Sequence, residues 1–320
     1  MFRSFLFFIF FLLPLSASGA LISNVGSILD VSVRPEYPRP NDVVTVRVSD
    51  PGNENSTAYV WSVNGKVVEQ GVGATAITVT TSGVGEVKVV EVVATQNGQI
   101  RASGTTFIRP GLIDIVWEGN TVTPPFYGAR PLPNGGSSLT LLAVPQLSVD
   151  GRVVDPSILS YSWRVDGIPV TNQSGYGKSS AILMPPRFGS AFTVSVSVTN
   201  QEGTAQAQSS VVIRPQTPKI IIYENAPLLG VRFNRIVSGL FSFKGDEVSF
   251  SAYPLFASSV QALTYEWSID GKPFTVDQFK PLDVKFRKVG EGVSSHAVTI
   301  TFNNPRNFIE NGKGTFGLQF

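Results

Sequence analysis

The chain has 320 residues, of which 25 are lysine or arginine, 23 are aspartate or glutamate, one is histidine and none is cysteine. A formal net charge of +2 is too small for the basic surface of a nucleic-acid-binding protein, so we exclude such a partner. The lack of cysteine excludes the inter-sheet disulfide of antibody domains, and with one histidine it excludes zinc sites built on those ligands.

Residues 1–20 have the layout of a secretory signal peptide. Arg3 supplies the positive charge, residues 5–15 form an apolar run, and residues 18–20 (Ser-Gly-Ala) suit a cleavage site. The alternative is an uncleaved anchor, but the run is shorter than the about 20 residues that a helix needs to cross a bilayer. No other long apolar stretch follows. We therefore expect an exported protein, secreted or in the cell envelope, whose mature chain has no transmembrane segment.

Apolar and polar residues alternate along many short segments. In residues 192–199 (FTVSVSVT), one face carries phenylalanine and valines while the other carries threonines and serines. Residues 43–48, 139–145 and 247–253 follow the same period of two, between clusters of glycine, proline and asparagine. This pattern predicts half-buried strands. The mature chain is therefore predicted to be all-β.

A Tyr-x-Trp pair precedes a tight turn three times. The three copies are TAYVWSVNGKVV (57–68), LSYSWRVDGIPV (159–170) and LTYEWSIDGKPF (263–274). The spacing between their tryptophans is the size of a domain, which indicates a tandem of similar domains. The predicted core aromatics are Trp61, Trp163 and Trp267.

Each copy is interpreted as a core-and-turn device, without a chemical role. Asn-Gly or Asp-Gly supplies the two positive-φ positions of a two-residue hairpin turn. The indole before the turn is large enough to anchor the packing of two facing sheets. The third residue after each turn glycine is predicted to return to the inward face: Val68, Val170 and Phe274.

Two Arg-Pro pairs divide the chain. Proline cannot continue a central strand, so Arg109-Pro110 and Arg214-Pro215 are predicted to mark domain exits. The predicted domains are residues 24–110, 111–215 and 216–320.

The Tyr-x-Trp motif before a glycine turn, together with residues 34–48 (RPEYPRPNDVVTVRV), resembles PKD and related Ig-like domains of bacterial surface proteins. The resemblance covers essentially all of the mature chain. Typical PKD domains carry Phe-Gly-Asp-Gly after the tryptophan, whereas this chain has Val-Asn-Gly, Val-Asp-Gly and Ile-Asp-Gly. A divergent PKD-like or generic Ig-like label is therefore used. The resemblance implies three tandem Ig-like β-sandwiches and brings no activity with it.

Candidates for catalysis or metal binding are few. Residues 49–57 (SDPGNENST) gather oxygen ligands around Asp50, but calcium requires about six to eight, so we favour a turn. Residues 175–180 (GYGKSS) lack the first glycine of a P-loop, because Asn172 stands there. His296 would have to serve any serine triad, yet no G-x-S-x-G motif occurs. We predict no catalytic residue, no metal site, no cofactor and no enzymatic activity.

Residues 123–136 (TPPFYGARPLPNGG) are too rich in proline and glycine for a regular strand. Exposed aromatics on such loops are typical of contact sites, so Phe126 and Tyr127 form a candidate partner-binding loop. The alternative, which we favour, is that the segment folds back to cover a sheet edge or an interdomain joint. Trp117 and its counterpart Tyr223 are expected at that joint.

These features together predict a non-enzymatic structural or adhesive protein–protein interaction module, secreted or held in the bacterial cell envelope. Its partner would be a cell-surface or envelope protein, or a polysaccharide. Two alternatives are an accessory subunit of an envelope machine, such as a pilus or secretion apparatus, and a carbohydrate-binding module.

Overall fold

The fold is taken from a computed structural model that describes residues 27–51, 53–185 and 190–320. The predicted signal peptide, residues 1–20, lies outside the described residues. Within those ranges the chain consists of strands and loops with two short 3₁₀ helices, η1 (Pro156–Ile158) and η2 (Thr171–Gln173), and no α-helix. Of the described residues, 27–32, 47–77 and 90–106 form one compact unit, and those within 33–46, 78–89 and 107–320 form another.

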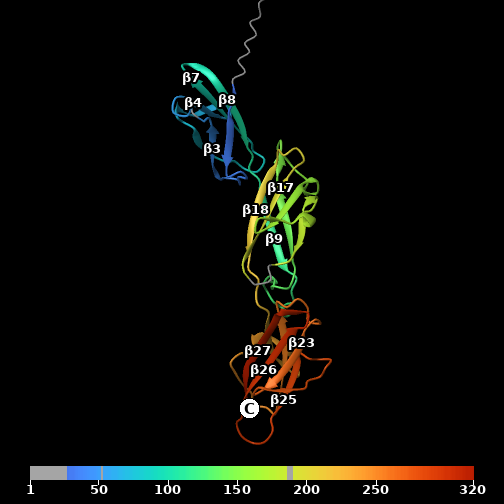
Figure 1. The fold of residues 1–320 in the computed structure, drawn as a ribbon. Helices are drawn as coiled ribbons and strands as arrows, with labels where there is room; N and C mark the ends of the chain where they lie inside the picture. The colour runs from blue at the N-terminus through green and yellow to red at the C-terminus, as the bar shows by residue number, and fades with distance from the viewer. Residues whose placement is uncertain (1–26, 52, 186–189) are drawn as a thin grey trace, which may run out of the picture. The chain divides into compact units, whose positions relative to one another are not determined.

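The first strand set, sandwich 1, forms two sheets (Figure 1). One sheet has the order β1-β8-β7-β4-β5 and the other the order β2-β3-β6. The strands are β1 (Ser27–Ile28), β2 (Asp30–Arg34), β3 (Val43–Ser49), β4 (Ala58–Val63), β5 (Lys66–Val72), β6 (Ala76–Thr80), β7 (Lys88–Gln96) and β8 (Gln99–Ile108).

The second strand set, sandwich 2, has sheets of order β16-β10-β9 and β14-β13-β17-β18, with β15 also paired to β13 and a small β11-β12 ribbon. The strands are β9 (Leu112–Gly119), β10 (Leu139–Gln146), β11 (Ser148–Val149), β12 (Arg152–Val153), β13 (Ser160–Val165), β14 (Ile168–Pro169), β15 (Gly175–Tyr176), β16 (Ser180–Leu183), β17 (Phe192–Thr199) and β18 (Gln206–Ile213).

The third strand set, sandwich 3, has sheets of order β20-β19-β22-β25 and β21-β27-β26-β23-β24. The strands are β19 (Lys219–Ala226), β20 (Gly230–Ile236), β21 (Leu240–Ser242), β22 (Glu247–Leu255), β23 (Thr264–Ile269), β24 (Lys272–Phe274), β25 (Asp283–Arg287), β26 (Ser295–Asn304) and β27 (Asn307–Gln319).

The three sets share the order of their central strands. The strand that carries Tyr-x-Trp (β4, β13 or β23) pairs with the next-to-last strand, which pairs with the last. In sandwiches 1 and 2 the other sheet joins an early strand, its successor at the centre, and a strand from after the Tyr-x-Trp hairpin. In sandwich 3 the corresponding three strands are β19, β22 and β25, and β20 is added at the edge beside β19. Immunoglobulin domains separate their A, B and E strands from C, F and G in this way. The chain is a tandem of immunoglobulin-like sandwiches.

The predicted period-two strands are confirmed, and in sandwiches 2 and 3 both sheets contribute to one core. β17 alternates strictly between buried and half-buried residues. Leu139 and Leu141 of β10 pack in one cluster with Trp163 of β13 and Val196 of β17. Sandwich 3 repeats this packing around Trp267 and Phe250. Apolar burial of this kind is the main favourable contribution to folding.

The three tryptophans have fully buried rings, with 0% of each side chain exposed. Each indole Nε1–H donates to a backbone carbonyl further along the chain: Trp61 to Ala74 (2.6 Å), Trp163 to Lys178 (3.1 Å) and Trp267 to Pro281 (2.9 Å). A buried N–H without a partner would cost free energy, so these bonds allow the whole ring to be buried.

The tyrosines of the motif lie on the same strand face as the tryptophans and also find partners. Tyr161 donates its hydroxyl hydrogen to the Pro156 carbonyl (2.9 Å) and Tyr265 to the Val260 carbonyl (3.0 Å). Tyr59 instead donates to the Asp50 carboxylate (2.7 Å). The Tyr-x-Trp pair thus places two large rings in each set, both with their polar atoms paired.

The predicted turns are confirmed. Asn64, Asp166 and Asp270 have φ values of 50°, 47° and 49°, and the glycine after each also has positive φ. Two of the side chains fasten the turn to the neighbouring strand. Asp166 accepts the Thr193 N–H (2.8 Å), and Asp270 accepts the Ala297 N–H (2.9 Å).

The prediction that the third residue after each turn glycine faces inward is wrong for Val68, which is 50% exposed. Val170 and Phe274 do pack against the cores of their sandwiches. In sandwich 1 the register shifts between Trp61 and Ser62, so that Trp61 lies opposite Glu69 and Ser62 opposite Val67. Val68 is therefore the extra residue of a β-bulge, and a bulge displaces the side chains that follow it.

Trp163→Ala should lower the free energy of unfolding of sandwich 2 by about 3–5 kcal/mol, because it opens a large cavity in the core. Urea unfolding followed by circular dichroism measures this change. The matched control is Tyr176→Ala, since that ring is 66% exposed and its removal should change stability by no more than about 0.5 kcal/mol. Equal losses from the two variants would contradict the assignment of Trp163 to the core.

Candidate functional site

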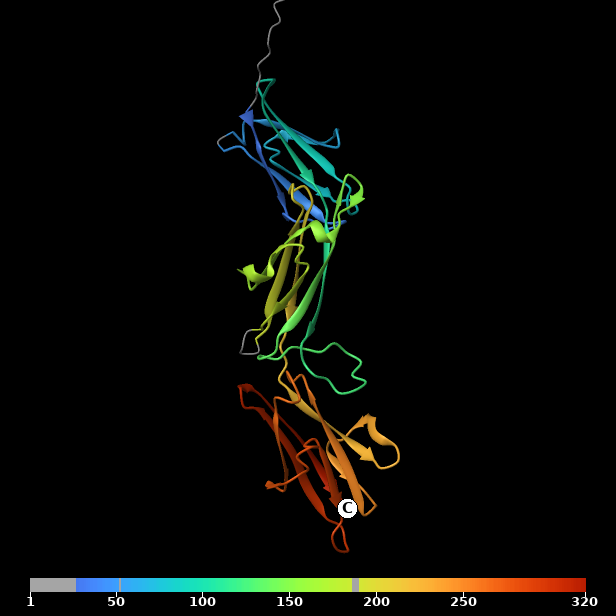
Figure 2. The same ribbon diagram turned by 90° about the vertical axis from the view of Figure 1, so that its right-hand side faces the viewer.

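A long irregular loop, residues 120–138, connects β9 to β10 (Figure 2). We call it the β9–β10 loop. Its four prolines cannot donate to a sheet ladder, which explains why no strand forms here. The two ends are joined by backbone bonds from Gly119 N to Pro131 O (2.8 Å) and from Asn120 N to Ser138 O (2.8 Å). A Cβ at Gly119 would overlap the backbone of Pro133, so the closure requires glycine.

The β9–β10 loop is bonded to sandwich 3 by two backbone hydrogen bonds. Val122 N donates to Ala257 O (2.8 Å), and Phe256 N donates to Val122 O (2.8 Å). Phe256 is 6% exposed and has a φ of 63°, a left-handed conformation that non-glycine residues rarely adopt. The bond to Val122 is one of the contacts that hold it there.

Asn134 supplies a second connection to sandwich 3. Its side chain is 1% exposed, and its Nδ2 donates to the Phe256 carbonyl (2.7 Å). Its Oδ1 accepts the Gly136 N–H (2.6 Å), which fixes the orientation of the amide. Both backbone polar groups of Phe256 are therefore bonded to the β9–β10 loop.

Glu310 of β27 lies at the centre of this contact and is 1% exposed. Its Oε1 accepts from Asn134 Nδ2 (3.2 Å) and from the Ser258 N–H. Its Oε2 accepts from Ser258 Oγ (2.7 Å) and Asn304 Nδ2 (2.6 Å). Burying a carboxylate is costly unless hydrogen bonds replace its hydration, and here four neutral donors do so. We call Asn134, Phe256, Ser258, Asn304 and Glu310 the joint network.

Tyr265 lies close enough to the joint network to respond to its charge. Burial raises the pKa of the Tyr265 hydroxyl to about 12, with a further contribution from the negative charge of Glu310. The ring also packs against the sandwich 3 core. The tyrosine therefore stays neutral and keeps its hydroxyl hydrogen for the Val260 carbonyl.

The two residues of the candidate partner-binding loop have different surroundings. The Tyr127 ring packs edge-on against Phe256, with 5.8 Å between ring centroids. The Phe126 ring contacts Phe233 of β20 at 5.5 Å, yet 89% of Phe126 is exposed. The loop thus folds back onto sandwich 3 and still presents one aromatic ring to solvent.

The two residues expected at the joint also differ. Trp117 of β9 is half-buried against the sandwich 2 core, with the Arg130 guanidinium 4.5 Å from its ring centroid. Tyr223 of β19 is 6% exposed and contacts the rings of Phe233 (5.2 Å) and Tyr253 (5.8 Å). Tyr223 and Phe126 therefore touch the same ring, that of Phe233.

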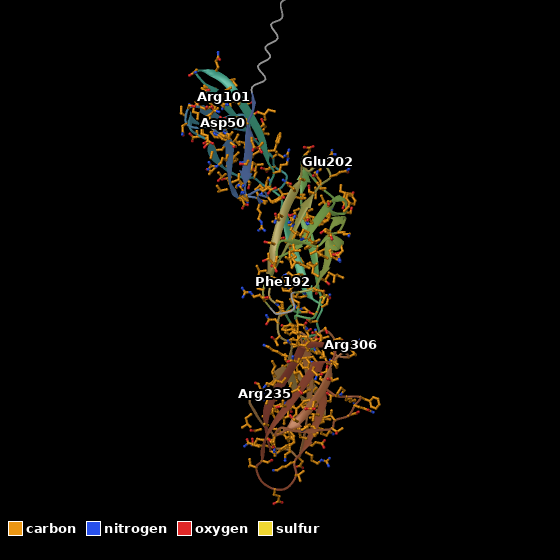
Figure 3. The ribbon with its side chains drawn as sticks, viewed as in Figure 1. Asp50, Arg101, Phe192, Glu202, Arg235 and Arg306 are labelled. Atoms are coloured by element: carbon orange, nitrogen blue, oxygen red, sulfur yellow. The ribbon has the colours of Figure 1, made fainter. Side chains whose placement is uncertain are left out.

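Asp50 and Arg101 form an ion pair in sandwich 1 (Figure 3). The carboxylate also accepts from Tyr59 Oη (2.7 Å) and Asn53 Nδ2 (3.3 Å). Burial acts to raise the pKa of Asp50, but these hydrogen bonds and the Arg101 charge outweigh it and lower that pKa. Burial and the bond to Asp50 raise the pKa of Tyr59 to about 12. The carboxylate is thus engaged by protein donors.

His296 lies beside the third turn, where its Nδ1 is 2.7 Å from Asp270 Oδ2. The hydrogen bond with His296, followed by the Ala297 N–H, lowers the pKa of Asp270. Both side chains are substantially exposed. Among the described residues, no group of three or more histidine, cysteine, aspartate or glutamate side chains could hold a metal ion.

Helices long and apolar enough to cross a membrane are not found among the residues that the structure describes. The predicted signal sequence is not part of that range.

Neither a protein-family model nor a curated protein sequence matches the chain. Solved structures similar to it include three N-terminal domains of the bacteriophage RB49 Highly Immunogenic Outer Capsid protein. That pair has 11% identity and a TM-score of 0.27, covering 91% of this chain and 98% of that one. The central fibronectin-III array of RIM-binding protein has 12% identity and a TM-score of 0.31, covering 91% and 95%. The Clostridium thermocellum CbhA fibronectin(III)-like modules have 12% identity and a TM-score of 0.28, covering 58% of this chain and 94% of that one. The strand order, and not these distant similarities, identifies the fold.

The sequence analysis did not find the joint network, although one signal was present. Glu310 has the same parity along β27 as Phe316 and Leu318, which are buried. An acidic residue at an inward position of a strand requires buried donors. The donor from sandwich 2, Asn134, lies in a loop whose course the sequence does not specify.

Asp50→Asn should destabilise sandwich 1 by about 1.5–3 kcal/mol at neutral pH, the range for hydrogen bonds to charged groups. Because the folded pKa of Asp50 is lowered, its contribution is complete above the unfolded pKa, about 3.9. It is lost as the pH falls through the lower folded value. Urea unfolding at pH 6, 4 and 2.5 should therefore show the variant and the wild type converging in acid.

Glu69→Gln is the matched control, because this carboxyl is exposed and lies on β5, which pairs with the strand that carries Tyr59. A stability difference for Asp50→Asn that stays constant from pH 6 to 2.5 would contradict a role for the charged form.

Proposed function

We propose that this protein is an exported, non-enzymatic interaction protein of the bacterial cell envelope, in which tandem PKD-like sandwiches present loops to a protein partner. The fold supports this proposal, since immunoglobulin-like sandwiches serve as scaffolds for binding loops. The ionisable groups described above support it too, because Asp50, Asp270 and Glu310 are engaged in structural contacts.

We also propose domain limits near 24–110, 111–215 and 216–320. Two features support them. β8 ends at Ile108 and β9 begins at Leu112, while β18 ends at Ile213 and β19 begins at Lys219. The two buried clusters extend from Ile113 to Ile213 and from Ile220 to Leu318. Each cluster therefore falls within one proposed domain.

The observation that carries the proposed function is exposed apolar surface next to β20. Phe126 is 89% exposed and contacts Phe233 of this strand. Leu228 and Leu229, in the turn that leads into β20, are 98% and 73% exposed. Large apolar side chains on loops are favourable anchors for a protein interface, where their burial supplies binding energy. This supports a protein partner over a polysaccharide.

Crosslinking in intact cells, followed by mass spectrometry, tests the partner. Phe126→Ala with Leu228→Ala should reduce recovery of the major crosslinked protein by at least about fivefold, the effect of losing an important anchor. Ile168→Ala is the matched control, because this side chain is 70% exposed on sandwich 2. Unchanged recovery from the double variant, or recovery of polysaccharide alone, would refute the proposed partner class.

The proposed export has its own test. Mass spectrometry of the protein isolated from the envelope or the medium should give a mature N-terminus near residue 21, because the small residues at 18–20 suit signal peptidase. Full-length protein that stays in the cytoplasm would contradict export, and full-length protein in the membrane would support the uncleaved anchor.

A further inference from the structure

We propose that Glu310 is the latch of a fixed joint: its buried carboxylate, held by donors from both sandwich 2 and sandwich 3, sets the orientation of these two sandwiches. This inference goes beyond the proposed function, since it concerns the chain alone and does not depend on any partner.

The first argument is the placement of the donors. Asn134 belongs to the β9–β10 loop, whereas Ser258 and Asn304 belong to sandwich 3. A carboxylate that served only the folding of sandwich 3 would be satisfied by the latter two. Asn134 supplies an additional bond, and both Asn134 and Glu310 are 1% exposed. The Glu310 carboxylate therefore lies at the contact between the two sandwiches.

The second argument concerns direction. A carboxylate has two oxygens with defined lone-pair directions, so four donors can converge on it in only a narrow range of geometries. Asn134 is itself fixed, because its Nδ2 is shared with the Phe256 carbonyl and its Oδ1 accepts from Gly136. A rotation of one sandwich against the other would break several bonds at once, and a buried acceptor left unpaired is costly.

The third argument is that the latch acts together with backbone contacts at the same place. The Val122–Ala257 and Phe256–Val122 hydrogen bonds lie beside it, and the Tyr127 ring packs on Phe256. These partners help to hold Phe256 in its left-handed conformation, which residues with a Cβ otherwise disfavour. Opening the joint would therefore release Phe256 as well.

The chain contains no cysteine, so pairs of introduced cysteines allow unambiguous spin labelling. Ser210→Cys in β18 and Thr301→Cys in β26 replace exposed residues, one in each sandwich. Pulsed electron–electron double resonance on the purified, doubly labelled protein should give a single narrow distribution of distances between the two spin labels. With Glu310→Gln, the ratio of latched to unlatched molecules should fall by roughly 10- to 100-fold, since hydrogen bonds to a charged group are lost, and the distribution should broaden.

Two controls and one independent variant keep the test decisive. Glu266→Gln makes the same change on the exposed side of β23, and Asn120→Ala alters the β9–β10 loop at a residue whose side chain bonds to Ser138. Both should leave the distribution narrow. Asn134→Ala removes the donor from sandwich 2, together with its bonds to Phe256 and Gly136, and leaves Glu310 its donors from sandwich 3. It should broaden the distribution, with near-ultraviolet circular dichroism unchanged.

Two outcomes would overturn the proposal. One is a wild-type distribution in both Glu310→Gln and Asn134→Ala. The other is a Glu310→Gln variant that loses near-ultraviolet signal while Asn134→Ala keeps the narrow distribution, because Glu310 would then be needed only for the folding of sandwich 3.

Discussion

Burying a polar atom costs free energy unless the atom finds a hydrogen-bond partner, and such partners explain the recurring Tyr-x-Trp residues of this protein. An indole can fill the centre of a small sandwich only if its N–H meets a carbonyl, and each of the three tryptophans does so 13–15 residues further along the chain. The tyrosine two positions earlier, on the same strand face, also has its hydroxyl group paired. In a chain without disulfides, these paired rings and the apolar residues around them hold each sandwich together.

The same requirement extends to places where the three sandwiches differ. In sandwich 1 the tyrosine partner is a carboxylate, which brings Arg101 and Asn53 with it. In sandwich 3 the Glu310 carboxylate is buried near the start of the long strand β27, and neutral hydrogen-bond donors satisfy it. One carboxylate is therefore balanced by a cation and the other by amide and hydroxyl groups. The sandwiches can differ in this respect because the tryptophan of each Tyr-x-Trp pair is buried and hydrogen-bonded without help from these carboxylates.

The sequence specifies what depends on neighbours along the chain. Period-two alternation identifies strands such as β17, and Asn-Gly or Asp-Gly identifies the turns, because both follow from local backbone geometry. The sequence does not show that Val68 faces outward, because the bulge that turns it outward depends on how β5 aligns with β4. It also does not specify the joint network, because Asn134 and Glu310 are 176 residues apart and meet only through the course of an irregular loop.

Tandem domains of similar sequence face a hazard during folding, since a strand from one copy can pair in the sheet of its neighbour. The bulge at Val68 makes the first hairpin one residue longer on its outer strand, β5, than a regular hairpin would be. A regular partner strand cannot align with it over its whole length, and Lys66 and Glu69 on β5 add charges at this outermost position of the sheet. A small irregularity in one copy thus makes its hairpin differ in register from the regular hairpins of the other two.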